Sequence, residues 1–450
     1  MRNNSALALI LEMQKLCKGY LKADDYLEAL SLFLAVGTVS PNTLRETGKL
    51  IDDPKTCQEY FFSELERLRL TTPNKPWETG RIAGVPGPVL AMLARVVSGS
   101  SASIPELAEA TRRYYVKNYL RRSEPDLTLQ KYLQALIGNL EGKSLLDSHC
   151  GLALKTELFS PALLVLNEPD PTLSRISHRL LIAQDIDVIF CKQDYLLAAC
   201  LPEGKSTNRD RSTLETHALQ LKGLFDIVIA EPPTRPLLQQ DQLEILAAKF
   251  PFLTSLPSEL PSTASTSLWI QQTLRQLNDS GTAYIIVSNG WLSRGGYDAT
   301  VRTALFNHAY VDSIIALEDD ANSKENRSIL VLKKQAKDSN EIVFLNEASA
   351  LNRALENVVI NEETGDLFEN IEPKPADPYC VTISAENILS NQDLNDRSAN
   401  LLAQHYLPSI EQTATYSDDQ RDETAILAQA EKRAQKAQLA LKTLIEKYQP

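Results

Sequence analysis

The sequence predicts an α/β protein built on a doubly wound parallel sheet, with a helical domain before the sheet and a long helix after it. Two observations lead to this prediction. After about residue 140, short apolar runs of strand length alternate with helix-like stretches, which is typical of parallel sheets covered on both faces. Before that point, and again at the C-terminal end, apolar residues recur at helical spacing.

Residues 1–125 are expected to form the helical N-terminal domain. Four stretches place their apolar residues at helical spacing, namely 7–21, 24–36, 56–70 and 89–97. Among these residues no cluster of charged side chains or histidines suggests chemistry. The functional site is therefore sought in the next part of the chain.

Residues 126–350 are expected to form the sheet domain. Seven short apolar runs have the length of buried strands: 143–147, 161–167, 187–194, 225–231, 282–288, 311–317 and 328–334. Helix-like stretches such as 173–183 and 267–278 lie between them. This alternation predicts strand–helix–strand units and hence a parallel sheet.

Two further sections complete the chain. Residues 351–416 are polar and contain prolines, and we expect an extension there. Residues 417–450 carry a heptad seam with small residues at its centre. Both a helix that packs on the body of the protein and a coiled coil with a partner fit this seam, which consists of Leu427, Ala430, Ala434, Ala437, Leu441, Leu444 and Tyr448.

Composition limits the classes of function. The chain has 450 residues, 43% hydrophobic content and a formal net charge of −12. A chain that binds duplex DNA alone normally needs a basic face, so DNA contact is expected only through a local patch or within a complex. No long uncharged apolar run or leader is seen, so we expect a soluble, cytoplasmic protein without membrane contact. The six scattered cysteines show no zinc-ligand spacing, and no metal site is predicted.

One strand ends in an unusual tetrapeptide. Residues 225–234 read FDIVIAEPPT, and the two consecutive prolines stop the sheet ladder and hold the chain rigid. In open parallel sheets ligands bind at the carboxyl ends of strands. The segment Glu231, Pro232, Pro233 and Thr234 is therefore the first candidate for a functional site.

The order of strand, EPPT, helix and the stretch VSNGWLSRGG at 287–296 resembles the modification subunit of type I restriction-modification systems, in the N6-adenine DNA methyltransferase family. The segments 311–317, 328–334 and 342–349 continue the match, and 383–395 is similar to the stretch before the family's terminal helix. The resemblance implies a Rossmann-like class I methyltransferase fold, S-adenosylmethionine as cofactor, and a specificity-subunit-like protein partner gripped by the C-terminal helix.

The resemblance also assigns cofactor-binding positions. The family's glycine-rich turn corresponds to 147–154, where Asp147, Cys150 and Gly151 are retained. Two later glycines are replaced by Ala153 and Leu154. Because a Cβ obstructs both the tight bend and the close approach of the cofactor, we expect binding to be weakened or lost.

Three more polar residues fall at family positions. The acidic residue that accepts the ribose hydroxyls aligns with Asn167, and Glu168 follows one place later. A shift of one residue reverses the side-chain direction in a strand, so both stay open. Asp194 matches the carboxylate near the adenine amino group, and it is equally explained as a helix cap.

At the tetrapeptide the resemblance implies catalysis with altered residues. The family places Asn, Asp or Ser before Pro-Pro, then an aromatic residue that stacks on the flipped base. Here those roles fall to Glu231 and Thr234. Glutamate is longer than aspartate, and threonine lacks a ring to stack, an interaction worth about 1–3 kcal/mol per base.

Four departures at cofactor and base positions lead us to expect a catalytically degenerate subunit of a DNA-modification or phage-defence complex. Two other classes remain open. One is an active S-adenosylmethionine-dependent enzyme, either an adenine-N6 DNA methyltransferase that uses the variant EPPT motif or a methyltransferase for another amino substrate, such as RNA or a protein amide. The other is a DNA-binding module, for which only GKSTNRDRST at 204–213 and the RGG at 294–296 offer local support.

Overall fold

The chain divides into two compact units, Met1–Ala403 and Gln404–Pro450. The computed structural model describes the following residues: 2–118, 125–156, 159–201, 211–233, 239–249, 264–317, 326–335, 341–346, 349–350, 380–390 and 400–407. Thr234 and the predicted heptad helix 417–450 lie outside these ranges. The fold below is therefore that of the first unit.

Helices form the N-terminal part of the first unit. Local sequence signals set the helix ends. At the start of α4, for example, the Asp53 side chain caps the helix by accepting a hydrogen bond from the Thr56 amide at 3.2 Å. Helix α2 is buried along most of its length. The helices are α1 Arg2–Cys17, α2 Ala23–Val39, α3 Pro41–Lys49, η1 Leu50–Asp52, α4 Pro54–Thr71, η2 Gly80–Gly84, α5 Gly87–Ser98, α6 Ile104–Asn118 and α7 Pro125–Ile137.

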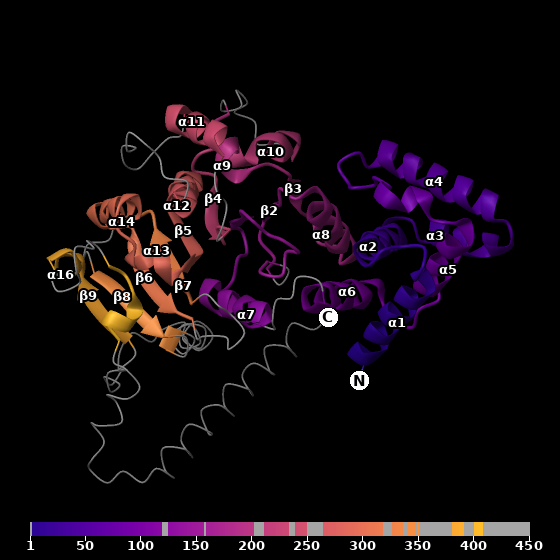
Figure 1. The fold of residues 1–450 in the computed structure, drawn as a ribbon, viewed down its shortest axis with the longest axis horizontal. Coiled ribbons are helices and arrows are strands. Elements are labelled where there is room, and N and C mark those ends of the chain that lie inside the picture. Colours follow the sequence, from indigo (N-terminus) through magenta and orange to yellow (C-terminus); the bar gives the residue numbers. More distant parts are fainter. Residues whose placement is uncertain are drawn as a thin grey trace, which may run out of the picture. The chain divides into compact units, whose positions relative to one another are not determined.

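A nine-stranded sheet follows, in the order β3-β2-β1-β4-β5-β7-β6-β8-β9. Each of the seven predicted apolar runs overlaps one of its strands. The bounds are β1 Ser144–Asp147, β2 Leu163–Asn167, β3 Ile189–Cys191, β4 Phe225–Ala230, β5 Leu277–Ser288, β6 Val311–Ala316, β7 Arg327–Lys333, β8 Glu341–Asn346 and β9 Cys380–Ser384. Figure 1 shows this progression, from β2 and β3 to the orange and yellow strands β6, β8 and β9.

The sheet is mostly parallel, and the prediction of a parallel sheet is wrong for two strands. Strands β3, β2, β1, β4 and β5 pair in parallel, whereas β7 is antiparallel to both β5 and β6, and β9 is antiparallel to β8. Parallel neighbours need a long crossover, usually a helix. Only residues 317–326 separate β6 from β7, so that pair returns as an antiparallel one.

Helices cover the sheet, as the α/β prediction requires. On one face, Leu129 and Leu133 of α7 share a hydrophobic cluster with alternate residues of the strands, such as Leu145, Ile227 and Ile229. The residues between them on these strands are also buried, which explains why the strands read as continuous apolar runs. The remaining helices are α8 Pro171–Ala183, α9 Tyr195–Ala198, α10 Arg211–His217, η3 Ala218–Gln220, α11 Gln240–Lys249, α12 Ser265–Gln276, α13 Asn289–Ser293, α14 Tyr297–Asn307, α16 Ala385–Ser390 and η4 Ala403–His405.

Helix α8 joins the N-terminal helices to the sheet. It packs on α2, and its Arg175 pairs with Glu28 at 2.7 Å. The guanidinium of Arg179 is fully buried and donates to the carbonyl oxygen of Pro76 at 2.8 Å. Because removing one partner of a buried ion pair costs about 3–5 kcal/mol, these contacts hold the two regions in a fixed arrangement.

Within the described ranges, no single helix is long and apolar enough to cross a membrane. One bent pair, Asp25–Val39 with Pro41–Asp52, meets the length and composition criteria when its two helices are taken together.

Candidate functional site

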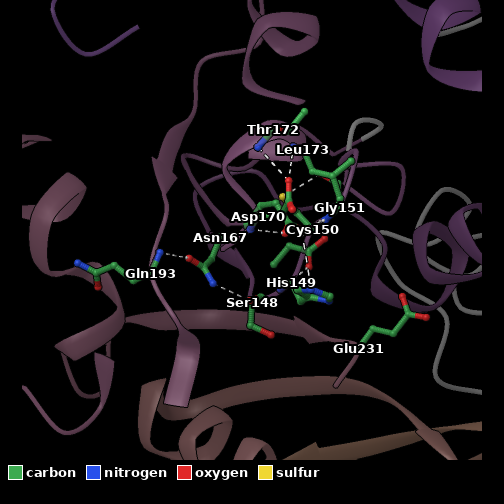
Figure 2. A network of polar contacts seen from close by, with 12 residues as sticks. Ser148, His149, Cys150, Gly151, Asn167, Asp170, Thr172, Leu173, Gln193 and Glu231 are labelled. Atoms are coloured by element: carbon green, nitrogen blue, oxygen red, sulfur yellow. Dashed lines mark hydrogen bonds and ion pairs between the residues drawn. The ribbon is translucent and has the colours of Figure 1, made fainter. Parts of the chain in front are cut away.

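The candidate site lies where the parallel strands β1, β2 and β4 end. Their carboxyl ends meet at one edge of the sheet, so residues that follow them in the sequence come together. The loop after β1 is anchored there: the Ser148 amide donates to the carbonyl of Ile229 at 3.0 Å, and the Cys150 amide donates to that of Asn167 at 2.9 Å. Figure 2 shows this loop beside Asn167, with Glu231 nearby.

The loop keeps a glycine-type backbone where glycine has been replaced. Gly151 has φ of 55° and Ala153 has φ of 59°. The left-handed conformation costs an L-residue roughly 1–2 kcal/mol. The tight bend that we expected a Cβ to obstruct is thus present, and Ala153 carries the strain. Leu152 and Leu154 are buried in a cluster shared with α8 and the N-terminal helices.

Asp147 ends β1 and is completely buried. Its Oδ1 accepts a hydrogen bond from the His149 amide at 3.3 Å, while its Oδ2 has no hydrogen-bond partner among the described residues. Burial raises the pKa of this carboxyl to about 6, an effect that nearby Lys155 opposes. A buried oxygen without a partner is the feature that a ligand at this loop would be expected to satisfy.

The two candidates at the end of β2 have different tasks. The Asn167 amide nitrogen donates to the Ser148 carbonyl at 3.0 Å, and its Oδ1 accepts from the Gln193 amide at 3.2 Å. Glu168 accepts from the amides of Gly151 and Asp170, both at 2.9 Å. Asn167 therefore ties β2 to its neighbours, and Glu168 is the carboxylate that holds the loop.

His149 and Glu168 lie side by side. The Nε2 of His149 is 3.9 Å from Oε2 of Glu168, and burial raises the pKa of that carboxyl. The imidazole also makes an edge contact with Trp269 of α12, at 5.9 Å between ring centroids. Trp269 in turn packs on buried Tyr195, with centroids 4.3 Å apart. These ring contacts of Trp269 could not be predicted from the sequence, because α12 reaches the loop only through the fold.

Asp194 is a helix cap in the structure. Its Oδ1 accepts hydrogen bonds from the amides of Leu196 and Leu197 at 3.0 and 2.9 Å, at the start of α9. The side chain is exposed. Of the two explanations left open by the sequence, the cap is the one whose contacts are seen, and a role near a base stays a prediction.

Glu231, directly after β4, is held by two cations. Its Oε2 is 3.0 Å from Nζ of Lys155, and its Oε1 is 3.0 Å from Nη1 of Arg327. The Lys155 ammonium also donates to the carbonyl of His149 at 3.2 Å. We call Lys155, Glu231 and Arg327 the ion-pair triad. Pro232 is buried and Pro233 is half-buried beside it.

Sequence reasoning missed both cations of the triad. Lys155 follows the glycine-type loop and belongs to no motif, and it is 76 positions from Glu231. Arg327 begins β7 and is 96 positions away. Only the strand order, which puts β7 beside β5 and β5 beside β4, brings Arg327 to the site. No spacing rule could have found this contact.

The polar groups in the turn after β5 are paired with residues of the turn and of neighbouring elements. Asn289 accepts from the Ser328 hydroxyl at 2.8 Å, and Arg294 pairs with Asp298 at 3.1 Å. The buried Arg302 guanidinium donates to the backbone carbonyls of Trp291 and Arg294. These contacts explain the RGG segment as a structural turn. In the other segment proposed for DNA contact, 204–213, only residues 211–213 are described.

No group of three or more potential metal-ligating side chains occurs in the part of the chain that the structure describes. All six cysteines lie in that part and carry free thiols. Burial raises the pKa of Cys150 well above its usual value, which keeps this loop thiol protonated and unreactive.

The strand order and the polar loops at the ends of β1, β2 and β4 define a Rossmann-like class I methyltransferase fold, which confirms the predicted fold class. Within it, residues 202–405 match the sequence model of the N-6 DNA Methylase family. The matched segment covers somewhat less than half of the chain. It includes the EPPT tetrapeptide and the turn after β5.

Solved structures agree on the fold. The methyltransferase subunit of the type I restriction-modification system from Streptococcus thermophilus has a TM-score of 0.62 and 13% identity, over 90% of this chain and 99% of that one. A modification subunit of a putative type I restriction enzyme from Vibrio vulnificus YJ016 has a TM-score of 0.58 and 13% identity, over 89% and 96% of the two chains. No curated protein matches significantly. Identities this low establish a shared fold alone.

Proposed function

We propose that this chain is an N6-adenine methyltransferase-type subunit of a DNA-modification or defence complex, in which the methyl-transfer site has become structural. The ion-pair triad is the observation that supports this most directly. Where the family offers an oxygen to the amino group of the target base, both oxygens of Glu231 are bound by Lys155 and Arg327 of the same chain.

The triad is a poor acceptor for a base. Positioning an adenine requires an oxygen whose lone pairs point at the exocyclic amino group. The lone pairs of Glu231 face an ammonium and a guanidinium, and the carboxylate is only 19% exposed. To serve a base it would have to leave charge-assisted bonds, each worth about 1.5–3 kcal/mol.

Some residues of the site favour the binding of S-adenosylmethionine, and others oppose it. Asp147, Gly151 and Glu168 are the residues that would hold it, and the unsatisfied oxygen of Asp147 fits a ligand donor. Lys155 does not fit, because its long side chain leaves this loop and pairs with Glu231 at 3.0 Å. We infer that the cofactor binds weakly or not at all, and no step of a reaction is assigned to it.

Assembly is the role that remains. A structure with a TM-score of 0.54 over the full length of both chains comes from work on complex assembly in the type I restriction-modification system. With a net charge of −12, this chain is suited to contact DNA only beside a basic partner. We propose that the heptad seam in residues 417–450 binds that partner, as modification subunits grip a specificity subunit.

The test is assembly of the full-length chain with the proteins encoded beside it, followed by size-exclusion chromatography with light scattering. Leu427→Asp with Leu441→Asp places charges in the seam and should abolish the complex. Gln429→Asp with Gln435→Asp places the same charges outside the seam and should leave it intact. If both pairs assemble as the wild type does, the seam is not the partner surface.

A methyl-incorporation assay distinguishes the proposal from the alternative of an active enzyme. The complex is incubated with labelled S-adenosylmethionine and unmethylated DNA, with Glu231→Ala as the comparison. We expect background incorporation from both. Wild-type incorporation that Glu231→Ala abolishes would establish an adenine methyltransferase that uses the EPPT motif.

A further inference from the structure

We infer that Lys155 supplies from within the chain the positive charge that a methyl donor would bring to this site. Its ammonium thereby excludes cationic S-adenosylmethionine more strongly than the neutral product S-adenosylhomocysteine. The inference rests on the proposed function, because it explains how the site stays folded without its cofactor. It adds to the proposed function that the site binds a neutral ligand in preference to a cationic one.

The position of Lys155 leads to this inference. The residue leaves the loop that would cradle the methionine part of the cofactor, and its Nζ reaches Glu231, the residue that would face the base. The same Nζ donates to the carbonyl of His149 within that loop, at 3.2 Å. The ammonium therefore lies between the loop that would hold the cofactor and Glu231, the residue that would face the base. A transferred methyl group would have to pass between these two places.

The charges at the site need this cation. Asp147 is fully buried, Glu168 is nearly so, and Glu231 lies within reach of the same ammonium. Buried carboxylates are stable only when paired or neutralised. Arg327 contacts Oε1 of Glu231, while Lys155 contacts Oε2 and also acts electrostatically on Asp147 and Glu168. The loop thus holds its acidic residues without any ligand.

A ligand's charge then becomes decisive. The sulfonium of S-adenosylmethionine is a cation, and a second cation beside Lys155 is repelled at short range in a partly buried site. S-adenosylhomocysteine carries a neutral thioether at the same atom, so it meets only the bulk of the side chain. The bulk of the Lys155 side chain weakens both ligands alike, whereas the ammonium discriminates between them.

The experiment is calorimetric titration of the full-length chain with each of the two ligands. The variants are Lys155→Met, which removes the charge and keeps the length, and Lys155→Ala, which removes both. Lys192→Ala is the matched control, because Lys192 is another cation in the sheet domain that is paired at 3.9 Å, in its case with Glu78. Circular dichroism verifies the fold of every variant.

We expect the wild type and Lys192→Ala to bind S-adenosylhomocysteine more tightly than S-adenosylmethionine, or to bind neither. Lys155→Met should improve S-adenosylmethionine binding by about tenfold or more relative to S-adenosylhomocysteine, the change that 1.4 kcal/mol produces. Lys155→Ala should show the same shift in ratio and tighter binding of both ligands. Unchanged binding, or an equal gain for both ligands, in Lys155→Met would mean that the charge of Lys155 does not discriminate between them, which overturns the inference.

Two results are informative without any variant. Wild-type protein that binds S-adenosylmethionine more tightly than S-adenosylhomocysteine overturns the inference even if every Lys155 variant fails to fold. Such binding without methyl incorporation would leave the proposed subunit role intact. Methyl incorporation by the wild-type complex would instead overturn the proposed function, so the two failures are distinguishable.

Discussion

The turn after β5 and the site at the strand ends both contain paired cations and carboxylates, and these residues have different roles in the two places. In the turn, Arg302, Arg294 and Asp298 form buried or half-buried contacts that hold the backbone of α13, and their segment keeps the residues that resemble the family. At the strand ends, Lys155 and Arg327 hold Glu231 beside the loop that follows β1. Cations therefore bind backbone carbonyls in the turn, and they bind a carboxylate side chain at the strand ends.

This contrast indicates which parts of the fold can change. The turn contributes buried contacts that the sheet needs regardless of any ligand. The strand-end loop holds buried acidic residues beside a cation of the same chain, Lys155. We therefore expect substitutions in the turn to cost more stability than substitutions in this loop.

Arg302→Ala should have the largest effect on stability. The change removes a buried guanidinium that donates to two carbonyls of the turn, leaves those carbonyls without their donor and takes a positive neighbour from buried Asp298. We expect a loss of about 4 kcal/mol in the free energy of unfolding, measured with urea. Arg113→Ala, on an exposed ion pair of α6, should cost less than about 1 kcal/mol. Equal losses would contradict the account of the turn.

Asp147 should make stability depend on pH. Its folded-state pKa is raised from 3.8 to about 6, so the native state binds the extra proton and stability falls as pH rises between these values. The penalty at neutral pH is about 3 kcal/mol. Asp147→Asn should therefore be stabilising relative to the wild type at pH 7.5, by more than at pH 3.5. Urea unfolding at the two pH values measures this difference, and a constant offset would refute it.

Glu231→Gln should destabilise the strand-end site by about 2 kcal/mol, because two charge-assisted bonds lose their anion. In an enzyme poised for catalysis, removing a strained or unpaired acidic residue commonly stabilises the fold. The sign of the change therefore separates the two accounts. Thermal unfolding of Glu231→Gln beside Glu66→Gln, a control whose side chain is exposed, supplies the measurement.

Ala153→Gly should have the smallest effect, a gain of about 0.5–1 kcal/mol. Relief of the left-handed strain is partly cancelled by the greater freedom of glycine in the unfolded chain. Ala309→Gly is the matched control, because Ala309 has φ of 54° in a loop far along the sequence from the site. Similar gains in both variants would show that Ala153 carries ordinary backbone strain. A loss at Ala153 would contradict the strain argument.

The fold was predictable from the sequence because its signals are local. Apolar runs at strand length located the strands from Leu145 to Ile329, and helix-like stretches located α8 and α12. The antiparallel course of β7 was missed, since strand direction depends on the length of a connection rather than on the strand's own residues. The sequence could not show whether Asn167 or Glu168 faces the loop, because this depends on the residue at which β2 ends.

The site was predictable only in part. Asp147, Gly151, Glu168 and Glu231 lie together at the strand ends, where the sequence placed them. Lys155 and Arg327 escaped notice, because their contacts with Glu231 depend on tertiary neighbours. The left-handed Ala153 was unexpected, since local preference argues against that conformation and the surrounding packing imposes it.

Methyl incorporation by the assembled complex tests the central claim most directly. Labelled S-adenosylmethionine and unmethylated DNA are supplied to the wild-type complex, and adenine-bound label is counted against a reaction without protein. The account predicts no label above that background, since Glu231 is held by Lys155 and Arg327. Incorporation that Glu231→Ala abolishes would contradict it and would make this chain a working adenine methyltransferase.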